Sequence, residues 1–511
     1  MRFFRSIMQL FCYLCTWSCR IGPPKRMINH KLVWSILGQL LLFMALLLAI
    51  CLGVAYYYGE SAVVAFGIPL GIVLIASSVL RYMGRGYTRH FNLRDGFYVV
   101  SLVWIVFSLF GTLPFLLSGT TDRFAHACFE SFSGFTTTGA TVIASLDTLP
   151  HSINFWRVLT QWIGGVGIVF FTIAIIPTIG GGEQKLFSAE TTGLKLVKLH
   201  PRIATTAHWI GSIYLFLTIA CAACFFFAGM NGFDAVSHAF TTIATGGFST
   251  HDASIGHFQS PAIEWVAIAF MLVSGINFAL LYLLFIKRRW RDIWKDEELR
   301  LFLGSVAAIA LCCTLALYFH DHREPMEALR ASVFQAVSIQ TTTGYVTENF
   351  MTWGFQVWFL LMLAGFCGAC TGSTTGGVKC ARVVTLWKLL RNEFLTMLHP
   401  RAYYPLRINR QTIAPNVIHR LCAFFLVYLS LLAVGTFVLL LTGLEPVDAF
   451  ACAASSLNNV GPSTGATISP VDTFASIPDL GLWTCTLLML AGRLEIFSLL
   501  IIFTPGFWRK Q

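Results

Sequence analysis

Four short loops rich in glycine and threonine recur along the chain, and their backbone oxygens could replace the water around a cation. They are Thr136–Thr141 (TTTGAT), Ala244–Ser249 (ATGGFS), Thr341–Val346 (TTTGYV) and Asn458–Ser463 (NNVGPS). The equivalent glycines, which are 108, 97 and 117 residues apart, are Gly139, Gly247, Gly344 and Gly461. Glycine permits the backbone dihedrals that aim carbonyl groups into a pore. The spacing therefore predicts four similar units around one pseudo-fourfold ion pore.

Each loop would contribute three residues to an ion filter, namely the glycine and the two residues before it. These residues are Thr137, Thr138 and Gly139, then Thr245, Gly246 and Gly247, then Thr342, Thr343 and Gly344, and finally Asn459, Val460 and Gly461. Threonine hydroxyls can add oxygen ligands or brace the loop. The stretch before each loop is interpreted as a half-membrane pore helix whose partially negative C-terminal end faces the ion. Tight helix packing explains one such loop equally well, but four in register favour a pore.

A polar residue precedes three of the four glycines by 13 positions. These residues are His126, Asp234 and Asp448. The shared spacing selects Gly247 over Gly246 in the second loop, and a polar side chain at this place is expected to cap the pore helix. The third unit has Arg330 or Ala331 in this region and departs from the pattern.

The composition is that of a membrane protein. Of 511 residues, 56% are hydrophobic and 12% are charged, with a mean hydropathy of +0.70, whereas a soluble domain carries about 25% charged residues. The net charge of +11 could suggest nucleic-acid binding, which would need basic and aromatic residues on one face. The basic residues instead occupy alternate connections, as in the cytoplasmic loops of membrane proteins. Their clusters are Arg81–Arg94, Lys185–Arg202, Lys287–Arg300, Lys379–Arg420 and Arg509–Lys510.

Ten membrane spans are expected, in an all-α fold of two N-terminal helices followed by four helix–pore loop–helix repeats. The first two spans cover 32–57 and 62–82. In the repeats, the outer helices lie near 96–117, 205–229, 299–319 and 419–443, and the second helices near 154–178, 262–286, 354–388 and 480–505. An even number of spans places both termini on one side, which the basic loops identify as the cytoplasm.

These spans divide the chain into six segments. They are a cytoplasmic tail (1–31), a two-helix unit (32–90) and pore repeats at 91–182, 183–290, 291–400 and 401–511. The apolar part of the tail is interrupted by Arg5 and Arg20 and lacks a small-residue cleavage site. The tail could be amphipathic, or the true start could be Met27. Acylation is one option for its three cysteines, which are Cys12, Cys15 and Cys19.

Six stretches of the chain resemble a known family. They read FESFSGFTTTGAT (Phe129–Thr141), QWIGGVGI (Gln161–Ile168), ATGGFSTHDASIG (Ala244–Gly256), GSTTGGVK (Gly372–Lys379), LNNVGPSTG (Leu457–Gly465) and GRLEIF (Gly492–Phe497). The chain is therefore similar to TrkH-type potassium uptake proteins of the Trk/Ktr/HKT superfamily. The resemblance implies potassium as the transported ion, bound at the four filter loops. Gly139 favours potassium, because plant relatives that transport sodium have serine at this position.

The resemblance also implies partners and a location. A cytosolic nucleotide-binding subunit of the TrkA type would dock on the basic inner face and move the gate, and two pore subunits would form a homodimer in a bacterial inner membrane. The chain has no Walker loop of its own, and no organic cofactor is expected. No loop contains the full TVGYG of tetrameric potassium channels, so the selectivity could be looser. Whether protons or sodium accompany potassium, as in a symporter, is left open.

The candidate gate lies in the third repeat. Its segment Ala364–Lys379 (AGFCGACTGSTTGGVK) is too rich in glycine, serine and threonine for a stable helix. A surface linker is the alternative, although the flanks on both sides are apolar. The resemblance implies an intramembrane loop that obstructs the pore below the filter. The candidate gating residues in this loop are Gly372, Ser373, Thr374, Thr375, Gly376, Gly377 and Lys379.

Arg493 lies about midway through the last apolar run, where a charge is costly and normally faces a partner or a cavity. Glu495 is two positions away and points to another side of the helix. Carbonyl groups of the 364–378 segment are therefore the expected partners. We assign Arg493 to the gate, as an electrostatic barrier to cations; the alternative is a structural arginine that ties helices together.

Two other functions remain as alternatives. A secondary transporter of another small cation or solute would bind it at the broken segment 364–378, but such folds usually show two repeats rather than four. An intramembrane enzyme would need catalytic side chains that converge. His238 and Glu130 lie in different pore helices, without a nucleophile motif or metal-ligand spacing nearby. The sequence therefore favours a transport pore over an enzyme.

Overall fold

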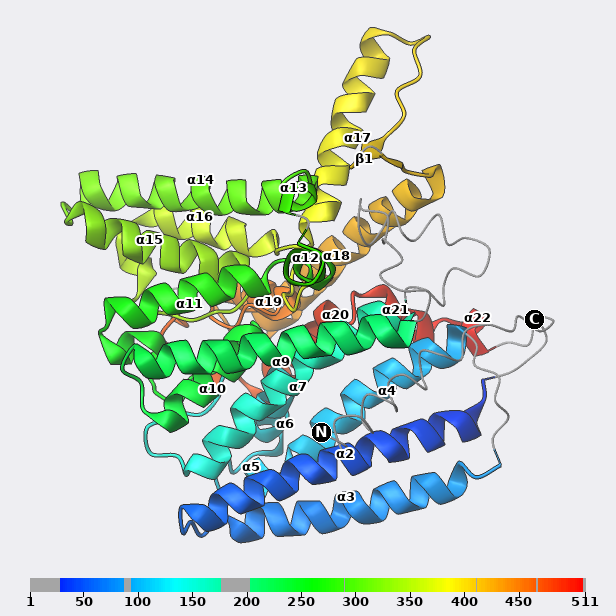
Figure 1. Ribbon diagram of the computed structural model, residues 1–511, viewed down its shortest axis with the longest axis vertical. Helices are drawn as coiled ribbons and strands as arrows, with labels where there is room; N and C mark the ends of the chain where they lie inside the picture. Colours follow the sequence, from blue (N-terminus) through cyan, green and yellow to red (C-terminus); the bar gives the residue numbers. More distant parts are fainter. Residues whose placement is uncertain are drawn as a thin grey trace.

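The chain folds into a bundle of helices, as predicted. The computed structural model describes residues 28–86, 93–175, 203–288, 290–409, 411–465 and 467–508. Within these residues, the two named strands, β1 (Arg407–Ile408) and β2 (Gln411–Thr412), form one antiparallel pair among the helices (Figure 1). Predictions for the tail up to Met27, for the cluster Lys185–Arg202 and for Arg509–Lys510 fall outside the described residues.

The two N-terminal helices pack closely along one side of the molecule (Figure 1). They are α2 (His30–Tyr57) and α3 (Val63–Met83), and both agree with the predicted spans to within two residues. Gly38 allows the close approach, because a Cβ atom there would collide with α3. The Ser77 hydroxyl donates to the Gly38 carbonyl at 2.6 Å. Small residues at such contacts are typical of membrane helices.

Four units of one plan follow, each with an outer helix and a shorter helix that leads into a Gly/Thr-rich loop. The outer helices are α4 (Leu93–Gly111) with α5 (Leu113–Leu117), α9 (Ile203–Phe227), α14 (Glu297–His320) and α18 (Pro415–Leu441). The shorter helices are α6 (Phe124–Phe135), α10 (Gly232–Ile243), α15 (Pro325–Gln340) and α19 (Pro446–Asn458). With 12 to 16 residues, they are about 18–24 Å long, too short to cross a core of roughly 30 Å.

A second helix completes each unit, and three of the four are interrupted. The second helices are α7 (His151–Ile175), α11 (Pro261–Ser274) with α12 (Phe278–Phe285), α16 (Phe355–Phe366) with α17 (Cys380–Leu398), and α20 (Asp479–Arg493) with α21 (Phe497–Leu500). α17 projects from the bundle (Figure 1). Short connecting elements are η2 (Ser254–Phe258), α13 (Trp290–Ile293), η3 (Phe350–Trp353), η4 (Phe474–Ser476), η5 (Ile501–Phe503) and α22 (Pro505–Trp508).

The predicted continuous helices at 262–286 and 480–505 are wrong, because the chain bends there by 102° and 106°. At the first bend, the Gly275 carbonyl accepts the N–H of Cys370 at 3.0 Å, so the loop of the third unit supplies a hydrogen bond in place of one within the helix. The Asn277 side chain then caps α12. At the second bend, Glu495 and Ile496 have φ angles of 53° and 57°, which end α20.

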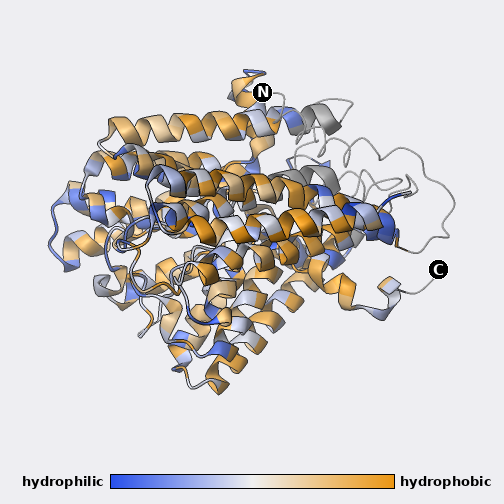
Figure 2. Cartoon of the chain, turned by 90° about the horizontal axis from the view of Figure 1, so that it is seen from below, coloured by the Kyte–Doolittle hydropathy of each residue, from blue (hydrophilic) through white to orange (hydrophobic). Residues whose placement is uncertain are grey.

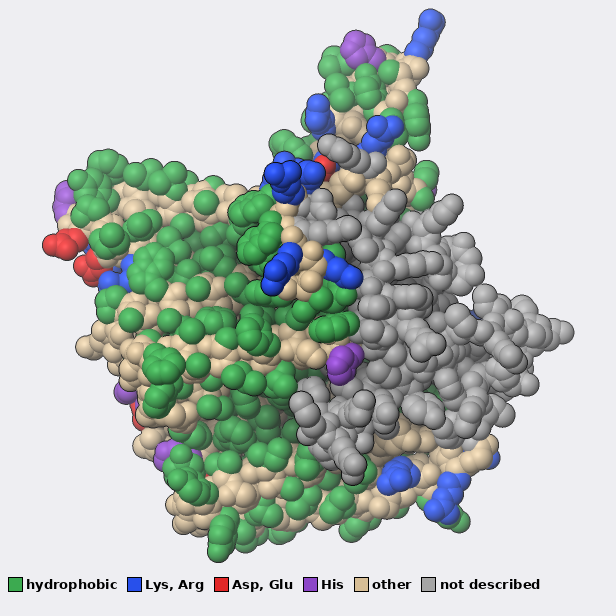
Figure 3. Space-filling model, in the orientation of Figure 1, with side chains coloured by type: hydrophobic (Ala, Val, Ile, Leu, Met, Phe, Trp, Pro, Cys, Tyr) green, Lys and Arg blue, Asp and Glu red, His purple; other side chains and the backbone are tan. Residues whose placement is uncertain are grey.

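The bundle has an apolar exterior. Among the described residues, six helices are long and apolar enough to cross a membrane, or up to eight if each bent pair is one span. The predicted total of ten also includes α7 and the α16–α17 pair. Hydrophobic residues run along the helices in Figure 2, and hydrophilic residues gather toward their ends. On the face shown in Figure 3, most acidic side chains lie toward one end, and most basic side chains lie near α13, α17 and α3. Cytoplasmic termini remain a prediction.

Candidate functional site

The four Gly/Thr-rich loops share one unusual backbone conformation. The φ angle is positive at each equivalent glycine, with values of 87°, 75°, 80° and 99° at Gly139, Gly247, Gly344 and Gly461. It is also positive two positions earlier, with values of 52°, 51°, 53° and 54° at Thr137, Thr245, Thr342 and Asn459. Positive φ is uncommon for residues that have a Cβ atom. The choice of Gly247 over Gly246 agrees with this shared geometry.

The four loops contact one another in a closed ring. At each equivalent glycine, a Cβ atom would overlap the carbonyl oxygen of the residue just before the next loop's glycine. Gly139 faces Gly246, Gly247 faces Thr343, Gly344 faces Val460, and Gly461 faces Thr138. The last contact returns to the first loop, so the loops are arranged with pseudo-fourfold order, and a side chain at any of the four glycines would force them apart.

All four glycines border one cavity of about 750 Å³, a volume that includes space open to solvent. The loops that follow the glycines form its walls, and the acidic residues Asp252 and Asp472 are among the lining residues. A cation in this cavity would meet carboxylates first and then the glycine loops. Rings of backbone carbonyl groups can replace the hydration shell of such an ion.

Hydroxyl groups of the short helices donate hydrogen bonds to carbonyl groups of the loops that follow these helices. Ser133 Oγ donates to the Ala140 carbonyl at 2.6 Å, and Ser338 Oγ donates to the Tyr345 carbonyl at 2.7 Å. Both serines lie six residues before their glycine. So does Ser455, whose Oγ donates to its own loop's glycine carbonyl at 3.0 Å. These bonds fix the carbonyl groups at or just after the glycines.

A residue of α7 holds the second loop on both sides of its glycine. Gln161 Nε2 donates to the Gly246 carbonyl at 2.6 Å, and Gln161 Oε1 accepts the Phe248 N–H at 3.0 Å. Gln161 is fully buried, so these bonds also satisfy its amide. The sequence predicted no role for this residue.

The polar residues 13 positions before the glycines do not cap their helices, so this prediction is wrong. The side-chain cap of α10 is Asn231, whereas α6 and α19 begin without one. Asp234 instead accepts the Thr250 hydroxyl at 2.6 Å, and Asp448 accepts the Thr467 N–H at 3.0 Å. A side chain in the first turn of these helices therefore faces the chain that returns from the loop, which it holds in place.

In the first unit, a buried ion pair holds the chain that returns from the loop. His126 lies in the first turn of α6, and its buried Nε2 has no hydrogen-bond partner in the described part of the chain. One turn later, Glu130 accepts the Val142 N–H at 3.1 Å and pairs with Arg157 Nε at 2.7 Å; both charged side chains are fully buried. Arg157 Nη1 also donates to the Ser249 carbonyl at 3.1 Å, which links the first unit to the second loop.

A hydrogen-bonded cluster joins the stretches of chain that follow the glycines of the first and second loops. Asp147 Oδ1 lies 2.6 Å from His251 Nδ1, and the Leu146 N–H donates to Asp252 at 2.6 Å. Hydrogen bonds to Asp234 and to Asp147 raise the pKa of His251 above its ordinary value. Partial burial acts to raise the pKa of Asp147, but its hydrogen bonds with His251 and Asp252, together with the attraction of His251, outweigh this effect and lower that pKa.

The candidate gating segment lies on the opposite side of the ring from the cavity. It contacts the residues that precede the glycines, whereas the cavity is lined by the glycines and the residues after them. Thr374 Oγ1 accepts the Thr245 hydroxyl at 3.1 Å, and the Gly376 N–H donates to Thr342 Oγ1 at 2.7 Å. A Cβ atom at Gly376 would also collide with the Asn458 carbonyl. The segment therefore touches the second, third and fourth loops.

Arg493 binds this segment, as expected from the sequence. Its Nη1 donates to the Thr374 carbonyl at 2.8 Å, and its Nη2 donates to the Gly164 carbonyl of α7 at 3.2 Å. Glu495 points elsewhere and pairs with Arg382 at 2.6 Å. A second cavity of about 400 Å³, a volume that includes space open to solvent, borders the segment at Thr375–Gly377 and Lys379, and its lining includes Arg493.

Two further charged residues anchor the segment at its ends. Glu298 Oε1 accepts the N–H groups of Thr371 and Ala381, at 2.5 Å and 3.0 Å. Lys379 Nζ donates to the carbonyl and the hydroxyl of Thr375. The other predicted gating residues have local contacts: Gly372 accepts the N–H at the start of α12, Ser373 bonds to Thr375, and Gly377 packs against Gly368. The sequence predicted Lys379 but not Glu298.

Comparison with known proteins places the chain among membrane transporters. The family model described as "TrkH: Cation transport protein" matches residues 64–510. The chain is 40% identical to the Trk system potassium uptake protein TrkH of Salmonella typhimurium over 460 residues, covering 89% of this chain and 95% of that protein. It is 33% identical to the Trk system potassium uptake protein TrkG of Escherichia coli K12, covering 89% and 94%. The crystal structure of the potassium transporter TrkH from Vibrio parahaemolyticus superimposes with a TM-score of 0.86 at 39% identity, covering 94% of this chain and 99% of that one.

Proposed function

Because this chain belongs to the TrkH cation transport family, we propose that it carries potassium ions across a bacterial inner membrane through its ring of four loops. The family consists of transporters, so the chain is not an enzyme. One observation carries the assignment of the pathway: four glycines with positive φ face four successive backbone carbonyls in a closed ring beside one shared cavity.

Potassium would enter through the cavity of about 750 Å³ and lose its water at the filter. The twelve filter residues named from the sequence supply backbone oxygens. Serine hydroxyls hold the carbonyl of the filter residue Gly461 and the carbonyls of Ala140 and Tyr345, which directly follow two other filter glycines. Uptake is driven at least partly by the membrane potential, which contributes about 2.3 kcal/mol per elementary charge for each 100 mV. No organic cofactor is needed for this step.

The segment between α16 and α17 is the proposed gate. It packs against the loops from the side away from the entry cavity, and a second cavity borders it. Arg493 cross-links it to α7 and places a positive charge below the filter. Displacement of this segment would join the two cavities and open the pathway.

A cytosolic nucleotide-binding subunit and a second copy of the chain are the proposed partners. The names of the relatives refer to a Trk system, which supports a multi-component assembly. α17 projects from the bundle and directly continues the gating segment (Figure 1). A partner that binds this helix could therefore move the gate.

The test is rubidium and potassium uptake by cells that lack their own potassium uptake systems, comparing wild type with Gly344→Ser. A side chain at Gly344 would collide with the Val460 carbonyl, so the variant should lose discrimination between potassium and sodium. Gly304→Ser is the matched control, because Gly304 lies on α14 with open space around it.

Growth of the wild type at low potassium, with loss of discrimination in Gly344→Ser alone, would support the filter. A well-expressed wild type without cation flux would first be retested with the cytosolic partner present. If flux were still absent, transport of another small solute would become the better explanation.

A further inference from the structure

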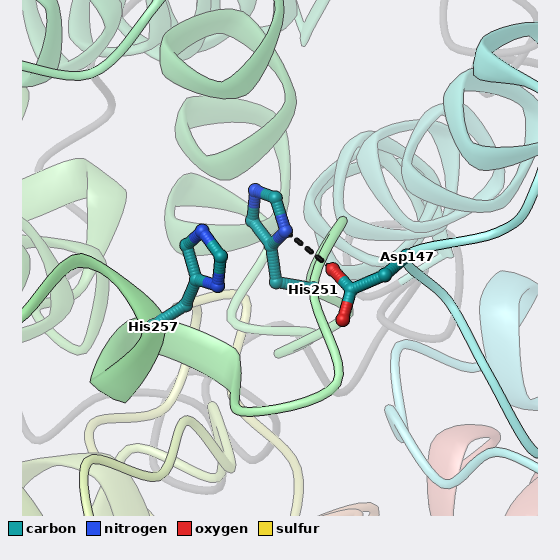
Figure 4. Close-up of side chains that lie close together, drawn as sticks. All are labelled: Asp147, His251 and His257. Carbon is teal, nitrogen blue, oxygen red and sulfur yellow. Dashed lines mark hydrogen bonds and ion pairs between the residues drawn. The ribbon is translucent and has the colours of Figure 1, made fainter.

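Three side chains with metal-binding atoms meet outside the filter, at the edge of the entry cavity. Asp147 comes from the loop after the first glycine, and His251 and His257 come from the chain after the second (Figure 4). Their nitrogen and oxygen ligand atoms all lie within 4.8 Å of one another. Asp147 and His257 are exposed and His251 is partly exposed, so an ion from the solvent can reach them.

The two histidine rings lie face to face, with centroids 3.6 Å apart and planes inclined by 2°. His251 Nδ1 points at Asp147 Oδ1, at 2.6 Å (Figure 4). Zinc binds histidine nitrogen and carboxylate oxygen at about 2.0–2.2 Å, which puts the ligand atoms of a tetrahedral site about 3.3 Å apart. Rotation of the two exposed side chains closes the remaining gap.

The other nitrogen of His251 is already oriented by a carboxylate. His251 Nε2 lies 3.2 Å from Asp234 Oδ2. Asp234 is held in turn by Asn231 Nδ2 at 2.7 Å and by the Thr250 hydroxyl at 2.6 Å. Histidines that bind metals almost always donate their second nitrogen to a carboxylate or carbonyl group. This arrangement leaves Nδ1 of His251 facing Asp147, with the His257 ring stacked beside it.

We propose that Asp147, His251 and His257 bind a divalent transition-metal ion, of which Zn²⁺ is the probe, at the rim of the entry cavity. Imidazole ligands suit zinc and related metals, whereas Mg²⁺ and Ca²⁺ prefer oxygen ligands. Three protein ligands leave the fourth position of the ion to water. The ion replaces the proton shared by His251 and Asp147, and links the outer loops of the first and second units.

Binding of the metal has a consequence for ion entry. His251 lines the same cavity as the four filter glycines. A dication at this rim repels an incoming potassium ion and offsets the negative charge of Asp252 and Asp472, which also line the cavity. Zinc bound at this rim therefore inhibits uptake. This effect rests on the proposed transport function, but metal binding itself does not.

The experiment measures ZnCl₂ binding to the purified full-length chain by isothermal titration calorimetry, and zinc inhibition of rubidium uptake in proteoliposomes. The main variant is His257→Gln, because His257 contacts His251 and Phe258 through its ring and its loss keeps the bonds of His251 to Asp147 and Asp234. The control is His320→Gln, which alters an exposed histidine 3.2 Å from Asp321. MgCl₂ is the control ion.

Wild type and His320→Gln should bind zinc alike, and His257→Gln should bind it at least about tenfold more weakly, the lower end of what lost metal-site contacts cost. Zinc inhibition should weaken in parallel. Equal zinc affinity in wild type and His257→Gln, or no zinc binding by the wild type, would overturn the site. Normal binding without inhibition would keep the site but reject its effect on ion entry. Absence of uptake in all variants, with binding intact, would count against the transport function instead.

Discussion

The filter loops and the gating segment are both rich in glycine and threonine, yet they are held in different ways. Three of the four filter loops are braced by a serine of their own preceding helix, as when Ser133 bonds to Ala140 and Ser338 bonds to Tyr345. The second loop is held by Gln161 of α7. The gating segment is held mainly by distant residues of other helices, above all Arg493 and Glu298. Composition alone therefore does not decide whether a non-helical segment is stiff.

The difference predicts different mobility. A loop tied to its own helix keeps its bonds when a neighbouring unit shifts, whereas a segment tied to distant helices loses its bonds when it moves away from them. We expect the ring of loops to behave as a fixed frame and the gating segment to behave as the movable part.

The largest effect should come from removing a buried charge that supports the frame. Arg157→Ala leaves the Glu130 carboxylate buried without its partner, and breaking such a pair costs about 3–5 kcal/mol. Thermal unfolding in detergent, followed by size-exclusion chromatography, measures the loss. Arg123→Ala is the control, because its pair with Asp479 is exposed on both sides and such pairs contribute about 0–1 kcal/mol. Similar unfolding temperatures for both variants would mean that the frame does not depend on this pair.

An intermediate effect, on flux rather than on stability, is expected from Arg493→Ala. The change removes two hydrogen bonds that tie the gating segment to α7. Hydrogen bonds to charged groups contribute about 1.5–3 kcal/mol each, so loss of the one to the gating segment should raise the open population by at least about tenfold. Rubidium flux into proteoliposomes measures the increase, with Arg391→Ala on the exposed part of α17 as the control. Unchanged flux at normal expression would leave Arg493 with a purely structural role.

The smallest effect is expected from removing a single hydrogen bond that supports the ring of loops. Ser133→Ala removes one hydroxyl bond to the Ala140 carbonyl, and a neutral hydrogen bond contributes about 0.5–1.5 kcal/mol. Potassium-over-sodium discrimination should fall slightly, while maximal rubidium flux stays close to that of the wild type. Ser430→Ala, on the exposed surface of α18, is the matched control. A large rise in flux would show that the loops are not a fixed frame.

The positions of the four loops could be predicted because glycine is visible in a sequence. The second residue with positive φ could not be predicted in three of the loops, since threonine gives no sign of a left-handed backbone. Only Asn459 is of a residue type that is enriched at positive φ. The 13-residue spacing is also visible in the sequence, but the capping role predicted from it is wrong. Asp234 and Asp448 bond to the returning chain, and a sequence does not show which neighbour a first-turn side chain will face.

The bends in the second helices could not be predicted either, because they depend on contacts with other parts of the chain. The stretches on both sides of each bend are apolar, so hydropathy predicts one straight helix in each case. The chain breaks at Gly275 because Cys370, from another unit, supplies the hydrogen bond there. Arg157 could have been found, since the argument that a membrane-embedded arginine needs a partner, applied to Arg493, holds equally for Arg157. Glu298 is harder to predict, because it lies at the very start of a helix, where acidic residues are common.

The closed ring of glycine contacts also affects how this protein can vary. In a channel of four identical subunits, one mutation changes all four loops at once. Here each loop is encoded separately, so a substitution changes one quarter of the ring and leaves three glycine–carbonyl contacts intact. The fourth loop, with Asn459 where the others have threonine, already differs from the other three. Ion preference can therefore change gradually over generations, one loop at a time.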